Sequence, residues 1–304
     1  MSNALTTSST AIAVEDRAFI DRDMYPFEPR AFQTGSGTIR YVDVGRGRPI
    51  LIAHGTPSWS FEWRNVIRAL QHDHRVIAPD HLGFGLSDRT NEVARLTPEE
   101  HAKRLAALAA SLDLRDAILI GHDFGGPIGL GALLSARERF SAMVLGNTWA
   151  WSLADRADVR RLSRIVASPL GKLLYLGLNA SPRWIVPAAF GNRRLLTPTI
   201  HRHYTAPFPS WRSRLAPWKL GVELAGSASF YDTLWSRRGE LATIPSAIVW
   251  GDADPTFREP ELTRLSEALP QARISRLPGV GHFTAEEDPE AWVRAVRTVS
   301  QFAH

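Results

Sequence analysis

The sequence of 304 residues contains no cysteine, which excludes disulfides, thiolate metal ligands and a cysteine nucleophile. It also lacks any apolar run long enough to span a bilayer. Its first residues have neither the basic nor the apolar region of a secretory signal. From these absences we expect a cytoplasmic protein with no membrane partner.

Lysine is rare: only three of the 36 basic residues are Lys, so the net charge of +5 comes from arginine. The arginines are scattered, and no block of five or six like charges occurs. Scattered arginine is typical of a solvated surface, so we expect no nucleic-acid partner. An apolar fraction of 44% and a charged fraction of 22% are typical of a globular protein.

Short apolar runs alternate with amphipathic stretches along most of the chain. Apolar or alternating runs typical of strands cover residues 38–44, 49–53, 75–78, 117–120, 141–145, 246–250 and 272–277. Helical spacing of apolar residues covers 96–112, 128–134 and 289–302. This alternation predicts an α/β fold whose mostly parallel sheet is covered by helices on both faces.

The alternation stops between residues 149 and 240, where no strand-like run occurs and Trp, Pro, Arg and Leu are frequent. A stretch of this length inside a compact domain is expected to be helical rather than loop. We therefore predict a core domain made of residues 1–148 and 241–304. A helical lid, residues 149–240, is inserted into it.

One strand is followed at once by a turn rich in glycine. Residues 118–126 read Ile-Leu-Ile-Gly-His-Asp-Phe-Gly-Gly, and a helical stretch follows. This is the nucleophile-elbow pattern, with Asp123 at its centre and Gly121 and Gly125 at its outer positions. Small residues are needed there because the central residue lies in a strained turn crowded by neighbouring backbone. The pattern predicts Asp123 as the nucleophile.

A second strand ends in the sequence His54-Gly55-Thr56-Pro57. In a fold of this kind, the loop after this strand supplies one half of an oxyanion hole, and the residue after the nucleophile supplies the other. We therefore expect the backbone N–H groups of Thr56 and Phe124 to point at the same place.

Two carboxylates and a histidine occupy the ends of the last two predicted strands. Asp252 and Asp254 follow the strand at 246–250, and His282 follows the strand at 272–277 within Gly-Val-Gly-His. The order nucleophile, acid, histidine is that of the α/β hydrolases. Asp254 lies farther into the loop that faces His282, so we favour it as the acid and expect Asp252 to hold the turn.

An aspartate nucleophile restricts the chemistry. A carboxylate is ionised at neutral pH and needs no base for its attack. Attack on an ester carbonyl would give an unstable anhydride, whereas attack on a saturated carbon bearing a leaving group gives a stable ester. The expected reaction is displacement of a halide or opening of an epoxide, after which His282 activates water against the ester. No cofactor and no metal are needed.

Three segments together resemble the haloalkane dehalogenases. They are residues 54–64 (HGTPSWSFEWR), 78–88 (APDHLGFGLSD) and 121–126 (GHDFGG). They are most similar to the members whose catalytic acid follows the later strand. The resemblance implies an α/β-hydrolase fold, with nucleophile Asp123, acid Asp254 and base His282. It further implies a small apolar substrate, water as co-substrate and a halide ion as product.

The sequence departs from that family at two positions. The family has Trp after the nucleophile, and its indole N–H helps to hold the leaving halide, whereas this chain has Phe124, which has no donor. The family's second donor is often an Asn at the position of Thr56, or a tryptophan of the lid. Among the lid tryptophans we take Trp149 and Trp151 as candidate substrate-binding residues.

These departures leave two alternatives open. Related epoxide hydrolases also use an aspartate nucleophile and protonate the epoxide with a lid tyrosine, for which Tyr175, Tyr204 and Tyr231 are candidates. A non-catalytic ligand binder on the same fold is the other alternative, because a fold alone does not determine function.

Overall fold

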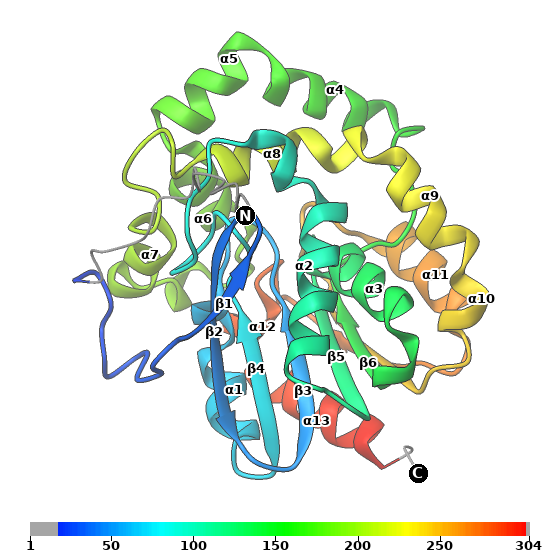
Figure 1. The fold of residues 1–304 in the computed structure, drawn as a ribbon. Helices are drawn as coiled ribbons and strands as arrows, with labels where there is room; N and C mark the ends of the chain where they lie inside the picture. The colour runs from blue at the N-terminus through cyan, green and yellow to red at the C-terminus, as the bar shows by residue number, and fades with distance from the viewer. Residues whose placement is uncertain (1–17, 302–304) are drawn as a thin grey trace, which may run out of the picture.

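A computed structural model describes residues 18–301 of the protein, and eight strands in these residues form one sheet (Figure 1). Their order across the sheet is β1-β2-β4-β3-β5-β6-β7-β8. The strands are β1 (Arg30–Thr34), β2 (Gly37–Gly45), β3 (Arg48–Ala53), β4 (His74–Pro79), β5 (Ala117–His122), β6 (Phe140–Gly146), β7 (Ser246–Gly251) and β8 (Arg273–Leu277).

Six of these strands run parallel. The pairs β4–β3, β3–β5, β5–β6, β6–β7 and β7–β8 are all parallel, whereas β1 and β2 add an antiparallel edge next to β4. The carboxyl ends of the six parallel strands therefore lie at one edge of the sheet. In an open α/β sheet this is the edge at which ligands bind.

Alternate residues of the central strands bury their side chains in two separate apolar clusters. In β5, Leu119 belongs to the cluster that includes apolar residues of α2 (Pro98–Ser111) and α3 (Gly125–Ser135). Ile118 and Ile120 belong to the cluster that includes residues of α1 (Arg64–Leu70) and α13 (Pro289–Ser300). Because both faces of the sheet are covered, these strands consist of continuous apolar runs. The predicted fold class is confirmed.

Helices and turns alone occupy the described chain between β6 and β7, and several of these helices arch over the carboxyl edge of the sheet (Figure 1). The segments are α4 (Ala157–Ala167), α5 (Pro169–Lys172), η4 (Leu173–Gly177), η5 (Ser181–Ile185), α6 (Val186–Ala189), η6 (Arg193–Leu195), α7 (Pro198–Thr205), α8 (Leu215–Gly226), α9 (Ala228–Ser236) and α10 (Arg238–Leu241). We keep the term lid segment for residues 149–240, as an interpretation of the chain's organisation. No helix within residues 18–301 has the length and apolar character needed to cross a membrane.

The remaining helices of residues 18–301 lie between the elements given so far. They are η1 (Ser60–Trp63) before α1, η2 (Val93–Leu96) before α2, η3 (Arg137–Arg139) before β6, α11 (Glu259–Ala268) between β7 and β8, and α12 (Thr284–Glu287) before α13. The loops after β3, β5, β7 and β8 all emerge at the carboxyl edge, beneath the lid segment. These are the loops that carry the residues selected from the sequence.

Candidate active site

Asp123 follows β5 directly and begins the turn into α3. Its φ is +52°, in the left-handed region that residues other than glycine rarely adopt. The turn brings α3 so close to β3 that a Cβ atom on Gly125 would lie 1.9 Å from the carbonyl oxygen of Ala53. Glycine at this position is therefore a steric requirement for presenting the Asp123 carboxylate at the edge of the sheet.

The Asp123 carboxylate is buried, and two backbone amides donate to it. The N–H of Thr56 donates to Oδ2 over 2.8 Å, and the N–H of Phe124 also donates to this carboxylate. Burial raises the pKa of Asp123 to about 6, although the charge of His282 and both amides act in the opposite direction. Asp123 is therefore mostly ionised at neutral pH.

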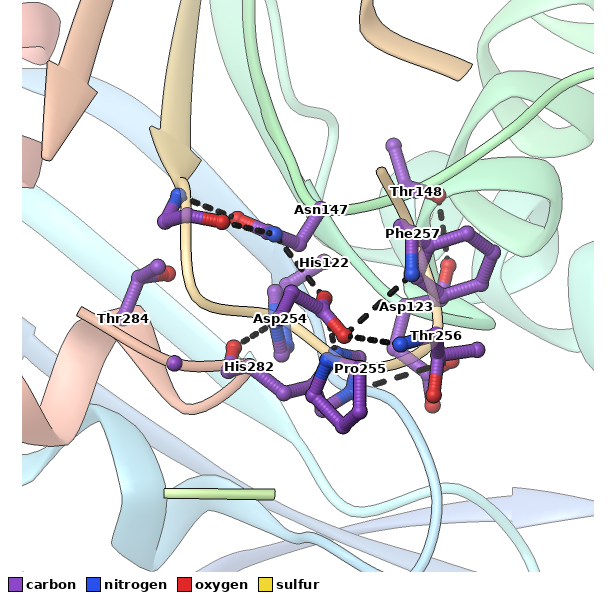
Figure 2. A network of polar contacts seen from close by, with 12 residues as sticks. His122, Asp123, Asn147, Thr148, Asp254, Pro255, Thr256, Phe257, His282 and Thr284 are labelled. Atoms are coloured by element: carbon purple, nitrogen blue, oxygen red, sulfur yellow. Dashed lines mark hydrogen bonds and ion pairs between the residues drawn. The ribbon is translucent and has the colours of Figure 1, made fainter. Parts of the chain in front are cut away.

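His282 lies between two carboxylates (Figure 2). Its Nδ1 is 2.7 Å from Oδ2 of Asp254, and its Nε2 is 4.0 Å from Oδ1 of Asp123. Burial alone would lower the pKa of His282, but the charge and hydrogen bond of Asp254 and the charge of Asp123 outweigh it and raise the pKa to about 9. The imidazole is therefore protonated at neutral pH while Asp123 is ionised.

Asp254 is held by three further groups of the chain, two backbone amides and one side-chain amide. Its Oδ1 accepts the backbone N–H groups of Thr256 (2.7 Å) and Phe257 (3.2 Å). Burial would raise the pKa of Asp254, but His282 and these amides hold it below its usual value. Asp252 instead forms an ion pair with Arg276 at 3.0 Å, at the surface. This geometry supports the choice of Asp254 over Asp252.

Asn147, which sequence reasoning did not select, fixes the position of the acid. It follows β6 and is fully buried; its Nδ2 donates to Oδ2 of Asp254 over 2.9 Å. Its Oδ1 accepts the N–H of Gly251 at the end of β7 (2.8 Å). Figure 2 shows the amide lying between the two strand ends. The signal in the sequence was a polar residue that follows the apolar strand almost directly, after a single glycine.

A second set of buried polar groups lies behind His282. His122 Nε2 donates to the backbone carbonyl of His282 over 2.7 Å, and its Nδ1 is 3.3 Å from Oε1 of Glu62. Ser58 donates to the other oxygen of Glu62. Burial raises the pKa of Glu62 to about 8 and lowers that of His122 to about 3. Both are neutral at pH 7, so the Glu62 carboxyl carries a proton beside the Nδ1 lone pair of His122.

The loop that carries His282 is also bound to the lid segment. The backbone N–H of His282 donates to the carbonyl of Ala189 over 2.8 Å. Glu287 accepts the N–H groups of Gly281 (3.0 Å) and, from the lid segment, of Asn192 (2.8 Å). The position of the histidine therefore depends on the lid backbone as well as on the sheet.

A cavity of about 150 Å³ opens beside Asp123. Side chains of the sheet loops, including Thr56, Phe124 and His282, form its floor together with Asp123. Its other walls are mostly apolar and come largely from the lid segment: Leu162, Val166, Tyr175, Ser181, Ile185, Val186, Ala189, Gly221 and Leu224. The site therefore suits a small apolar molecule.

One of the three candidate lid tyrosines borders this cavity. Tyr175 lines it, and burial together with the charge of Asp123 raises its pKa to about 12, so its hydroxyl stays protonated. The other two hydroxyls are used inside the protein: Tyr204 donates to Glu286 (2.9 Å), and Tyr231 donates to the carbonyl of Glu223 (3.0 Å). Tyr175 is therefore the tyrosine that can reach a substrate.

The two candidate tryptophans lie outside the cavity lining. Trp149 is fully buried and packs edge-on against Phe124, with ring centroids 4.9 Å apart. Trp151 packs against Trp235, with Arg264 over its ring. Trp149 thus supports the wall of the site, and Trp151 has no contact with it. Both rings are held by packing within the protein, and direct contact of either with a substrate stays a prediction.

Sequence comparison identifies relatives over most of the chain. A family profile described as alpha/beta hydrolase fold matches residues 48–289. Haloalkane dehalogenase 2 of Mycobacterium tuberculosis is 34% identical over 278 residues, which cover 91% of this chain and 96% of that protein. A cis-3-alkyl-4-alkyloxetan-2-one decarboxylase of Shewanella oneidensis is 30% identical over 272 residues, which cover 87% of this chain and 85% of that protein.

Structural comparison agrees with the sequence. The crystal structure of an ancestral haloalkane dehalogenase matches with a TM-score of 0.79 and 25% identity, over 90% of this chain and 98% of that one. DatA, a haloalkane dehalogenase of Agrobacterium tumefaciens, matches in fold with a TM-score of 0.82, over 93% of this chain and 100% of that one.

The close approach of α3 to β3 can be tested by adding a methyl group at Gly125. We expect Gly125→Ala to lower the free energy of unfolding by about 1–3 kcal/mol, because the added methyl meets backbone that cannot move aside. In the matched control Gly239→Ala, the new Cβ has no neighbour within 4 Å, and stability should be unchanged or slightly raised. Urea denaturation of the three proteins measures this, and equal stabilities would refute the steric account.

The charge of Asp123 should be visible in the titration of His282. Because that charge raises the pKa of the imidazole, Asp123→Asn should lower the pKa from about 9 toward neutrality. NMR titration of the histidine rings, with His282→Gln to assign the signal, measures the change. As a control, Asp252→Asn removes a carboxylate that pairs with Arg276 instead, and should leave the titration of His282 where it is. An unchanged pKa in Asp123→Asn would contradict the proximity of the two groups.

Proposed function

Because the chain belongs to the haloalkane dehalogenase family of α/β-hydrolase-fold proteins, we propose that it hydrolyses small haloalkanes through an ester formed at Asp123. The observation that carries the proposal is the asymmetric environment of the Asp123 carboxylate. One oxygen accepts a backbone N–H, and the other faces His282 at 4.0 Å beside an apolar cavity. A carboxylate arranged in this way serves as nucleophile with one oxygen and as oxyanion with the other.

In the first step, Oδ1 of Asp123 attacks the carbon that carries the halogen. A new carbon–oxygen bond forms as the carbon–halogen bond breaks, and the bonding electrons leave with the halide. No base takes part, since Asp123 is already ionised at neutral pH. The apolar walls of the cavity favour this step because they leave the attacking carboxylate poorly hydrated.

Ester formation prepares the second step by removing the charge of Asp123. That charge helps to keep the imidazole of His282 protonated, so its loss lowers the pKa of His282 and favours the neutral base. His282, oriented by Asp254, then takes a proton from water, and the oxygen of that water attacks the ester carbon of Asp123. The bond between that carbon and Oδ1 then breaks, the departing alkoxide takes a proton from His282 to become an alcohol, and the oxygen from water completes the regenerated Asp123 carboxylate.

The oxyanion of the second step develops on Oδ2, to which the amide of Thr56 already donates, and the amide of Phe124 also donates to the resting carboxylate. The donors therefore need no reorganisation when the charge forms, and each contributes about 3 kcal/mol to lowering the barrier.

The departing halide has fewer hydrogen-bond donors than the oxyanion has. Phe124 has no side-chain donor, but Thr56 lines the cavity and its hydroxyl is buried without a partner among residues 18–301.

Trapping the ester tests the proposal directly. His282→Gln cannot activate water, so after incubation with a bromoalkane it should carry one alkyl group on the peptide that contains Asp123, as detected by mass spectrometry. Asp123→Asn is the control and should carry none. A parallel incubation with an epoxide, repeated with Tyr175→Phe, tests the alternative reaction. An adduct formed only with the epoxide, and reduced in Tyr175→Phe, would reassign the protein to epoxide hydrolysis.

A second candidate function is favoured by Phe124 and by the decarboxylase relative. In a four-membered lactone, the ring oxygen is a carboxylate leaving group on a saturated carbon. Attack by Asp123 would open the ring without releasing a halide. The reaction would then not need the indole N–H donor that Phe124 lacks. Breakage of the bond to the new carboxylate would then release carbon dioxide, form an alkene and expel Asp123. No water is consumed in this sequence.

The two functions differ in their need for His282. Decarboxylation of a dialkyl oxetan-2-one should persist in His282→Gln with many turnovers and stop in Asp123→Asn, as measured by alkene formation. Halide release from a bromoalkane should instead end after one equivalent in His282→Gln. A His282→Gln variant that forms no alkene, in a chain whose wild type does, would show that lactone opening proceeds through water activation.

A further inference from the structure

Exposed large apolar side chains gather on one part of the molecule. Nine of the ten that are more than one third exposed in residues 18–301 lie in the lid segment: Leu162, Ile165, Leu170, Leu173, Leu178, Trp184, Ile185, Leu195 and Trp211. The tenth, Ile274, is on β8. Single exposed apolar residues are ordinary, but a concentration of this kind marks a surface that contacts something other than water.

Seven of these residues follow one another along α4, α5, η4 and η5, and we call them the lid patch: Leu162, Ile165, Leu170, Leu173, Leu178, Trp184 and Ile185. In α4, Val159 and Val166 point inward and are buried, whereas Leu162 and Ile165 are 50% and 42% exposed. Helices α4 and α5 form the outermost arch of the molecule, at the end opposite α13 (Figure 1). The apolar face of this arch therefore has no covering element in the described chain.

Basic residues accompany the lid patch without acidic partners. Between Asp158 and Glu223 the chain has eleven Arg and Lys residues and no Asp or Glu. The lid segment as a whole has 14 basic and five acidic residues, a net charge of +9, whereas the rest of the chain has 22 and 26, a net charge of −4. Arg161, Arg164 and Arg183 are exposed beside the patch and form no ion pair within residues 18–301.

The cavity reaches this surface. Leu162 of α4 and Ile185 of η5 both line the cavity beside Asp123, and both are about half exposed. Both residues of the lid patch therefore contact the cavity and the outer surface of the molecule. A molecule that left an apolar phase in contact with the patch would meet the cavity without crossing water.

We propose that the lid patch docks on the surface of an anionic lipid membrane, with Leu, Ile and Trp side chains in the acyl boundary and arginines at the headgroups. Interleaved apolar and basic residues with no acids are the composition of interfacial helices. A nucleic-acid surface would leave the aliphatic side chains unpaired, and they are too numerous for that partner. The expectation of no membrane partner rested on the absence of a spanning segment, and docking of this kind needs no such segment.

Vesicle flotation of the purified full-length protein tests the proposal without any substrate, so its outcome is independent of the proposed reaction. The wild type should float with vesicles of phosphatidylcholine containing phosphatidylglycerol, and much less with phosphatidylcholine alone. Asp123→Asn should behave as the wild type does. Absence of flotation with the anionic vesicles would overturn the proposal.

Two double variants separate the contributions to docking. Arg161→Gln with Arg164→Gln should lower the partition coefficient roughly 30-fold, and Arg46→Gln with Arg115→Gln, exposed but outside the lid segment, should lower it far less. Leu170→Ser with Leu173→Ser should abolish flotation, whereas Ile274→Ser should not.

Two outcomes would assign the lid patch to something else. Flotation that depends on the arginines but survives Leu170→Ser with Leu173→Ser would indicate simple adsorption of charge and overturn insertion of the patch. A dimer in analytical ultracentrifugation that dissociates in the same leucine variant, together with no flotation of the wild type, would assign the patch to contact between two copies of this chain.

Discussion

Every part of the site depends on one backbone constraint, the left-handed conformation of Asp123 between β5 and α3. It directs the carboxylate out of the sheet edge and places the amide of Phe124 opposite that of Thr56. The fold tolerates this conformation because Gly125 lets α3 approach the carbonyl of Ala53. The strain at one residue is balanced by the packing of the whole strand–helix unit around it.

Sequence reasoning reached those parts of the fold and site that depend on local pattern. The parallel strands were visible because strands buried on both faces are continuous apolar runs. Asp123 was visible because it follows such a run within a glycine-containing turn, and His282 because it lies in a glycine-containing loop after the last strand. Strand β1 was not recognised, because it lies at the exposed edge of the sheet and none of its residues is fully buried.

The partners missed from the sequence are those brought together by tertiary structure. Asn147 and Asp254 are 107 positions apart, and His122 and the carbonyl of His282 are 160 apart, so no spacing rule connects them. Glu62 was not singled out in the sequence, yet it is fully buried, and burial raises its pKa to about 8. The tryptophans also depend on tertiary structure, since the sequence alone could not show that Trp149 and Trp151 pack against Phe124 and Trp235.

The hydrogen bond from the His282 amide to Ala189 links the proposed base to the lid segment, and both residues line the cavity. A movement of the lid large enough to break this bond would release the loop that aims the imidazole at Asp123. In the proposed reaction, such a movement would separate the admission of substrate from the activation of water. The ester would then be hydrolysed only while the lid backbone holds the His282 loop in place.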